Sequence, residues 1–271
     1  MPDPMVSVTP GRDPGVQALL GDGPLPVRAI ATSDLREALA RGAADFWDKP
    51  SHVVFLALIY PLAGIVLARL VVGYDVLPLL FPLVAGFALI GPFAALGLYE
   101  ISRRREAGLD ASWSHAFEVF RSPGFGSILV LGLLLLSIFL IWMGVAWAIY
   151  VATMGSAVPT SALGFLGTVL TTGPGWAMIV IGNAVGFLFA LLVLMISVVS
   201  FPLILDRHVG ALTAIRTSIA AVRANPVVML TWGLIVAAGL VLGLLPLFVG
   251  LAIVLPVLGH ATWHLYRRVV A

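Results

Sequence analysis

The sequence predicts an all-α, polytopic membrane protein with six transmembrane helices, arranged as three hairpins that each follow a cytoplasmic amphipathic helix. Of the 271 residues, 61% are hydrophobic and only 10% are charged, and the mean hydropathy is +1.09. A soluble domain keeps about a quarter of its residues charged. The apolar residues also gather in long runs, each near the ~20 residues that cross ~30 Å of hydrocarbon. We therefore expect lipid to be the main solvent of this chain.

Six apolar runs define the expected spans, at residues 52–72, 76–101, 127–151, 176–205, 227–244 and 247–266. Lysine and arginine fall before the first run, between the second and third, between the fourth and fifth, and after the last, with Arg69 as the one exception. Because loops rich in these residues stay in the cytoplasm, both termini are expected there. An aromatic belt is expected at the inner boundary, from Trp47, Tyr99, Trp113, Trp263 and Tyr266.

The chain before the first run divides in two. Residues 1–32 are rich in proline and glycine and predict a disordered cytoplasmic tail, whereas residues 33–271 form a single six-span domain. Cysteine is absent, which excludes disulfides, thiolate nucleophiles and cysteine-based metal sites.

A helical segment with one apolar face precedes each odd-numbered span and ends at a proline: Pro50, Pro123 or Pro226. Helical spacing predicts three apolar faces, namely Leu35, Ala38, Leu39, Gly42 and Phe46; Trp113, Ala116, Phe117 and Phe120; and Leu212, Ile215, Ile219 and Val222. The second span of each pair contains its own proline, at Pro92, Pro202 or Pro256. These correspondences favour an internal repeat of three parallel units, 34–105, 110–207 and 209–268, although surface helices and helix-starting prolines also recur by chance.

Few polar residues fall inside the spans. Arg69 near the outer end of the first span is close enough in sequence to pair with Asp75, which favours an interfacial anchor over a ligand site. Asn183 lies between Gly182 and Gly186, a spacing typical of close helix packing, and its amide is a candidate for hydrogen bonding between helices.

The remaining candidates lie at the inner ends of the second and sixth spans. Tyr99, Glu100 and Arg103 stand at the same distances from Pro92 as Trp263, His264 and Arg267 do from Pro256. Glu100 with its neighbouring arginines favours a charge cluster that faces lipid headgroups or a partner. His260 and His264 are one helical turn apart, so they could share a metal or haem, but interfacial hydrogen bonding is the favoured interpretation. The sequence contains no known catalytic motif, and we expect no enzyme activity, metal or cofactor.

Four strings, at residues 81–104, 112–113, 200–207 and 256–267, resemble a prokaryotic integral membrane family classed as a domain of unknown function. Some members carry the label cytochrome c oxidase subunit I. The resemblance implies a bacterial inner (plasma) membrane location and supplies no catalytic residues. The sequence does not resemble a haem-copper oxidase subunit, which has twelve helices and histidines deep in several of them. All five histidines here fall near one side of the predicted spans.

These observations favour a non-enzymatic membrane protein that acts as an accessory, assembly or interaction subunit of a respiratory or photosynthetic complex. Its expected partners are membrane lipids and another integral membrane protein, and the basic residues at the inner leaflet do not indicate nucleic acid. One alternative is a permease for a small or apolar solute, and a second is haem or metal binding through His260 and His264.

Overall fold

In the computed structural model, the part of the chain that is described is mainly helical, and it contains one isolated β-bridge, between Val27 and Val270. The structure describes residues 23–48, 64, 77–87, 91–156, 159, 161–245 and 250–271. Its main helices are α2 (Thr32–Asp48), α4 (Leu80–Phe87), α6 (Leu96–Glu106), α7 (Phe125–Met154), α8 (Ala162–Thr171), α9 (Gly173–Ser197), α10 (Ser200–Arg207), α11 (Ala211–Ala224), α12 (Pro226–Leu244) and α13 (Leu251–Val269). Shorter pieces are the 3-10 helices η1 (Leu77–Leu79) and η3 (Trp113–Arg121), and α5 (Gly91–Ala94).

Three helices among the described residues are long and apolar enough to cross a membrane: α7, α9 continued by α10, and α12. They correspond to the predicted spans at 127–151, 176–205 and 227–244. The run at 52–72 lies outside the described residues apart from residue 64. The other two runs are described only in part. The described residues of 76–101 form η1, α4, α5 and α6, with a turn at residue 95, and α13 is not apolar enough over a full span.

A proline explains where α9 and α10 divide. Pro202 is the third residue of α10, directly after the break at residues 198 and 199. A proline has no N–H to donate to the carbonyl four residues earlier, so it ends or kinks a helix. At this break the Val199 N–H donates instead to the Ser218 hydroxyl, 3.3 Å away on α11. The break therefore lets α11 hold the end of α9.

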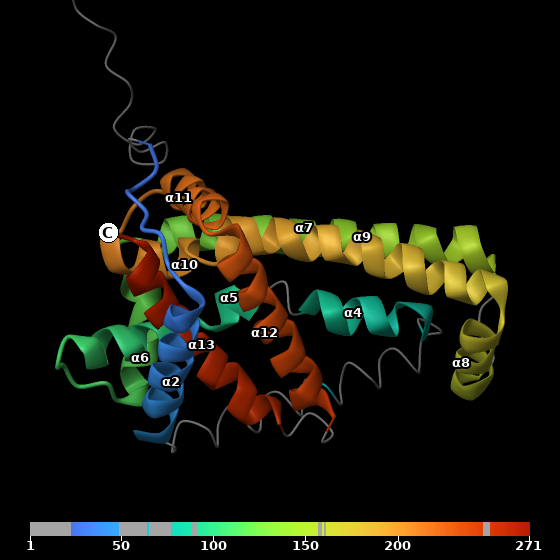
Figure 1. Cartoon of the computed structure of the whole chain (residues 1–271), viewed down its shortest axis with the longest axis horizontal. Coiled ribbons are helices and arrows are strands. Elements are labelled where there is room, and N and C mark those ends of the chain that lie inside the picture. The colour runs from blue at the N-terminus through green and yellow to red at the C-terminus, as the bar shows by residue number, and fades with distance from the viewer. Residues whose placement is uncertain are drawn as a thin grey trace, which may run out of the picture.

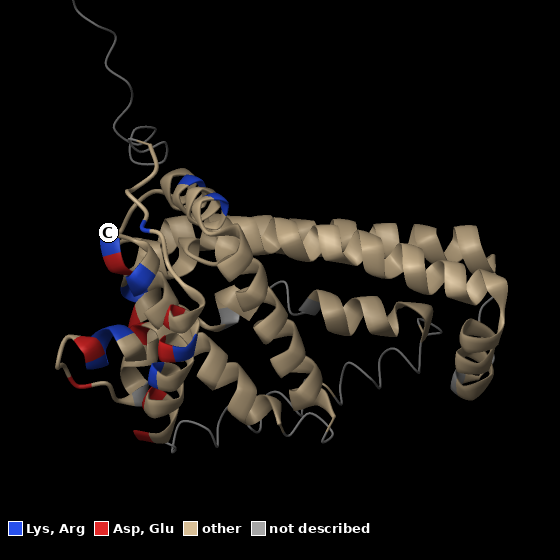
Figure 2. Cartoon of the chain, viewed as in Figure 1, with Lys and Arg blue, Asp and Glu red and all other residues tan. Residues whose placement is uncertain are grey.

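Figure 1 shows two groups of helices that start from a common end and run in different directions. α7 and α9 run side by side along the long axis, with α8 at their far end, while α12 and α13 leave in a second direction. α4 lies along α7, where the Trp142 indole N–H donates to the Pro82 carbonyl at 2.9 Å. The described charges gather at the common end, and the far end of α7 and α9 has none (Figure 2). The expected six-span bundle of three hairpins is not seen in the described residues.

The common end is a packed unit that we call the polar module, made of α2, α6, η3, α10, α11 and residues 257–269 of α13. Tyr99, Trp263 and Tyr266 are 2% or less exposed, and they form its core together with Phe201. The predicted aromatic belt is therefore wrong for these three residues, which face protein and not headgroups. Trp47 is 65% exposed, and the Trp113 side chain lies outside the described ones.

α2 packs along α13, with Leu35, Ala38, Gly42 and Phe46 buried. These are four of the five residues on the face that the spacing predicts, and that face meets protein. A Cβ on Gly42 would lie 2.6 Å from the Ala261 nitrogen and 2.7 Å from the Val257 carbonyl oxygen. The two backbones thus approach more closely than any residue with a side chain would allow.

The other two pre-span segments bury different faces from those predicted. Residues 113–121 form a 3-10 helix, in which residues three apart share a face. Ala116 and Val119 are consequently buried, whereas Phe117 and Phe120 are 56% and 60% exposed. In α11 the predicted Val222 is buried, but the rest of the buried face consists of small residues, and Leu212, Ile215 and Ile219 are only half-buried. Close packing against α9 and α10 favours the small residues.

Residues 23–31, which composition places in the tail, run as an extended segment across the polar module. The Arg28 N–H donates to the Val269 carbonyl at 2.7 Å, and the Ala271 N–H donates to the Pro26 carbonyl at 3.1 Å. The Asn225 amide, which precedes α12, accepts from the Ile30 N–H at 2.8 Å and donates to the Arg28 carbonyl at 3.0 Å. The segment is therefore fixed at both edges, by the C-terminus and by the junction of α11 and α12.

Thr213 offers a test of packing in α11. Its hydroxyl is buried and has no hydrogen-bond partner among the described residues. A buried hydroxyl without a partner costs about 1–3 kcal/mol, so Thr213→Val, which keeps the shape, is expected to stabilise the protein by about 1 kcal/mol. Thermal unfolding of the purified protein in detergent, followed by tryptophan fluorescence, measures the change. A lower melting temperature would show that the hydroxyl is satisfied in solution.

Candidate functional site

The densest polar contacts of the module centre on Asp45, near the end of α2. Its side chain is only 8% exposed. Oδ1 accepts from Arg105 Nη1 at 2.8 Å, while Oδ2 accepts from the Ser102 hydroxyl at 2.6 Å and from His264 Nε2 at 2.8 Å. Three partners from α6 and α13 thus converge on one carboxylate, which joins these helices to α2.

The direction of these hydrogen bonds determines that Nδ1 of the other histidine, His260, carries a proton. Ser102 donates its single proton to Asp45, so the bond between Ser102 Oγ and His260 Nδ1, 2.7 Å long, has His260 as its donor. Ser102 is fully buried and His260 is 3% exposed. The chain His260, Ser102, Asp45 therefore runs through the interior of the module as a satisfied network.

The surroundings of Asp45 act on its pKa in opposite directions. Burial disfavours the charged form and raises the pKa. The hydrogen bonds from His264 and Ser102, with the charges of His264 and His260, more than offset burial, so the pKa of Asp45 lies below its usual value. Asp45 is therefore a carboxylate near neutral pH, consistent with its role as an acceptor only.

A second buried carboxylate, Glu100, lies two residues before Ser102 on α6. Glu100 is 3% exposed and accepts from Arg103 through two parallel bonds, Nη2 to Oε1 at 2.7 Å and Nε to Oε2 at 2.8 Å. Arg104 Nη1 lies 4.0 Å from the same Oε1. Such a two-pronged pair is among the stronger side-chain contacts, so Glu100 is held by its own helix end. Its carboxylate faces protein groups.

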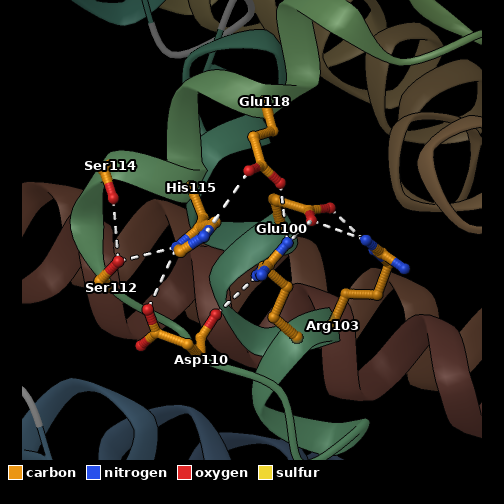
Figure 3. A network of polar contacts seen from close by, with 8 residues as sticks. Glu100, Arg103, Asp110, Ser112, Ser114, His115 and Glu118 are labelled. Atoms are coloured by element: carbon orange, nitrogen blue, oxygen red, sulfur yellow. Dashed lines mark hydrogen bonds and ion pairs between the residues drawn. The ribbon is translucent and has the colours of Figure 1, made fainter.

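The contacts around Glu100 continue into η3, as Figure 3 shows for Glu100, Asp110, Ser112, His115 and Glu118. Arg104 donates to Glu118 Oε2 at 2.7 Å and to the Asp110 carbonyl at 2.6 Å. His115 Nδ1 lies 2.7 Å from the Ser112 hydroxyl and 3.7 Å from an Asp110 carboxylate oxygen. These contacts fasten η3 against α6.

The C-terminal end of α13 is tied to both neighbours by carboxylates. Glu106 accepts from the Trp263 indole at 2.9 Å and from Arg267 Nε at 3.0 Å. Asp206 on α10 accepts from the Tyr266 hydroxyl at 2.6 Å. Each of the three carboxylates Asp45, Glu106 and Asp206 therefore joins α13 to a different helix.

The structure brings five of the eight candidate residues together. Tyr99, Glu100, Arg103, His260 and His264 all lie in the polar module. Asn183 lies apart from them on the exposed side of α9, and Arg69 and Asp75 are outside the described residues. The two histidines do not face a common open space, because His260 Nδ1 contacts Ser102 and His264 Nε2 contacts Asp45.

Sequence reasoning missed Asp45, Ser102, Glu106 and Asp206. For Asp45 a signal was present, because it follows Ala38 and Gly42 by seven and three residues and thus lies on the apolar face of α2. A charged residue at such a position is buried only when it is paired. No comparable spacing marks Ser102, since α6 carries no regular apolar face.

The arrangement positions helices and offers little for chemistry. The Ser102 hydroxyl is fully buried, and its proton is already directed to a carboxylate. The described residues include no group of three or more histidine, aspartate or glutamate side chains that could hold a metal ion. Both histidine rings use a nitrogen in the hydrogen-bond network, so haem or metal binding finds no support in their geometry.

Comparison with known proteins identifies a family match. Residues 80–206 match the model of a family described as "Predicted integral membrane protein (DUF2189)". This confirms the resemblance to an uncharacterised membrane family of unknown function. No curated protein and no solved structure matches the chain.

Proposed function

We propose that this integral membrane protein is a non-catalytic accessory or assembly subunit, which binds another membrane protein along the outward face of α9. The observation that carries the proposal is the position of Asn183. It is the eleventh of the 25 residues of α9, and it is exposed among Val180 and Phe187, which are 64% and 58% exposed. A polar amide thus faces outward in the middle of an apolar helix.

The cost of this position in lipid is the physical basis of the proposal. One Asn183 N–H donates to the Ile179 carbonyl of its own helix at 2.8 Å. The amide oxygen has no partner among the described residues, and a polar group without a partner in hydrocarbon costs several kcal/mol. A facing helix could supply the missing donor, for a gain of about 0.6–2 kcal/mol.

The backbone beside Asn183 allows a helix to approach. A Cβ on Gly182 would meet no atom within 4 Å, so this position is open on its outer side. Gly186 faces inward, because a Cβ there would lie 3.1 Å from the Trp142 ring. Of the two glycines that flank Asn183, one therefore serves packing inside the chain and the other faces a partner.

The polar module supports a non-catalytic role. Its carboxylates and histidines are committed to holding α2, α6, α10 and α13 together. The predicted partner is a respiratory or photosynthetic complex, as in the sequence analysis above.

The placement of charge supports a bacterial inner-membrane protein with the polar module in the cytoplasm. The described arginines lie at one end of the molecule (Figure 2), as the positive-inside rule requires for a cytoplasmic end. The absence of cysteine allows a clean test. A cysteine in place of the exposed Ser114 should escape a membrane-impermeant maleimide in intact cells, and labelling would contradict this orientation.

The three-unit repeat also stays a proposal, supported by how the pre-span segments pack. α2 of the first unit packs on α13 of the third, η3 of the second packs on α6 of the first, and α11 of the third packs on α10 of the second. Each pre-span segment thus contacts the post-proline helix of the preceding unit, in a closed cycle. An experimental structure whose units could not be superimposed by rotation about one axis would contradict it.

Asn183→Val tests the partner proposal, because it removes the amide and keeps the helix apolar. Gentle detergent extraction after chemical crosslinking in cells should recover the wild-type chain with a bound membrane protein. The amount of that partner recovered with the variant should be about fivefold lower, which corresponds to a loss of about 1 kcal/mol in binding free energy. The matched control is Ser137→Ala on α7, where an exposed hydroxyl bonds only to its own helix at 2.8 Å and the recovered partner should be unchanged. Recovery of the wild type as a lone monomer, or equal recovery from Asn183→Val, would count against the proposal.

A further inference from the structure

The described arginines divide into those that are paired with carboxylates and those that are not. Arg103, Arg104, Arg105, Arg267 and Arg268 each form ion pairs within the module. No carboxylate partner is found among the described residues for Arg28, Arg36, Arg121, Arg216 and Arg223. Two of these unpaired residues belong to α11, which contains no acidic residue.

Arg216 and Arg223 share the outer face of α11. Seven residues are about two helical turns, so both side chains point the same way, about 10 Å apart along the axis. Both are exposed. Leu212 and Ile219, which helical spacing places on the same side, are half-buried. The opposite face, which includes Ala214 and Ser218, is buried in the module. The outer face of α11 therefore combines two free guanidinium groups with partly exposed apolar side chains.

The position of α11 places this face at the edge of the apolar region. α11 ends at Ala224, and the candidate membrane span α12 begins two residues later at Pro226. Figure 1 shows α11 crossing the charged end of α7 and α9. η3, which lies just before α7, exposes Phe117 and Phe120 at the same end. Exposed aromatic and basic residues directly beside apolar spans are typical of the headgroup level of a bilayer.

We propose that the outer face of α11 is a docking surface for anionic phospholipid headgroups. The guanidinium groups of Arg216 and Arg223 match phosphate oxygens in charge and in two-pronged hydrogen-bond geometry. Leu212 and Ile219 enter the boundary with the acyl chains, as in helices that lie in a membrane interface. This inference does not rest on the partner proposed for α9, which lies on another helix.

A lipid titration tests the proposal on the full chain. The purified protein in detergent is mixed with dansyl-labelled phosphatidylglycerol or dansyl-labelled phosphatidylcholine, and energy transfer from tryptophan reports binding. The anionic lipid should bind at least about tenfold more tightly than the zwitterionic lipid. Arg216→Gln and Arg223→Gln should each weaken phosphatidylglycerol binding about fivefold, and the double variant about 25-fold. High salt should reduce the difference between the two lipids, because the contacts are exposed.

Arg36→Gln is the matched control, because Arg36 is also unpaired in the described structure but belongs to α2. It removes the same charge and should leave lipid binding within twofold of the wild type. Equal affinity for the two lipids, or equal weakening by Arg36→Gln and Arg216→Gln, would overturn the proposal. Inorganic phosphate that displaced the probe as well as unlabelled phosphatidylglycerol does would also overturn it, in favour of a soluble anion.

Discussion

Asp45→Asn is expected to destabilise the protein by about 3 kcal/mol, because it removes the charge from a buried carboxylate and leaves its partners in place. The Arg105 guanidinium loses its 2.8 Å ion pair with Oδ1, and Ser102 and His264 lose a charged acceptor at Oδ2. For a chain of this size the melting temperature should fall by about 6–12 °C. Tryptophan fluorescence during heating in detergent measures the change.

Asp48→Asn is the matched control on the same helix. Asp48 is 52% exposed and lies 3.4 Å from the same arginine. An exposed ion pair contributes about 0–1 kcal/mol, so the control should change the melting temperature by no more than about 4 °C. Similar losses from the two variants would show that Asp45 is no more important than a surface charge.

Acid titration gives a second readout for Asp45. Because its pKa is lower in the folded protein than in the unfolded chain, its contribution to stability is complete above the unfolded pKa of about 3.9. That contribution is lost as the pH falls through the lower folded pKa. The wild type should therefore lose more stability than Asp45→Asn over that range, so that the two melting temperatures converge. Parallel curves for the two proteins would contradict the assignment.

Gly42→Leu should release α2 from α13 at a cost of about 3 kcal/mol or more. The atoms that a Cβ would meet at 2.6–2.7 Å belong largely to the α13 backbone, which cannot rotate out of the way. The helices must separate, and the Asp45 network is carried apart with them. Hydrogen exchange of the α2 amides should accelerate sharply, because their protection depends on this packing.

Gly144→Leu on α7 provides the control for adding the same side chain to a helix. A Cβ on Gly144 would meet no atom within 4 Å, and leucine favours a helix over glycine by about 1 kcal/mol. This variant should keep or slightly raise the melting temperature. Unchanged exchange of α2 in Gly42→Leu would show that the two helices are not in contact in solution.

The apolar helices and the apolar face of α2 could be predicted from the sequence, because hydrophobic runs and helical spacing are local properties. The buried faces of α11 and η3 could not be predicted in full, because tertiary packing determines them. In α11 the small residues Ala214 and Ser218 are buried and the larger Leu212 and Ile219 are only partly so, because space between the helices is limiting. The 3-10 geometry of η3 depends on its contacts with α6 and is not encoded in a periodic pattern.

The candidate site was predictable only in outline. The spacing of Glu100 and Arg103 from Pro92, and the separation of His260 and His264 by one helical turn, predict candidate residues that do lie in one module. Their partners were not predictable, since His264 and Asp45 are separated by 219 residues and no local signal relates them. Asn183 was identified from its flanking glycines, but only the structure shows that its amide faces outward.

The packing of α2 on α13 has a consequence for biogenesis. More than 200 residues separate Leu35 and Phe46 from the helix that covers them, so α2 leaves the ribosome long before α13 does. Until α13 has emerged, nothing can complete the bridge between Val27 and Val270 or the contact of Asp45 with His264. The candidate spans α7, α9 and α12 are thus synthesised before the polar module can close, and emergence of α13 is the event that completes it.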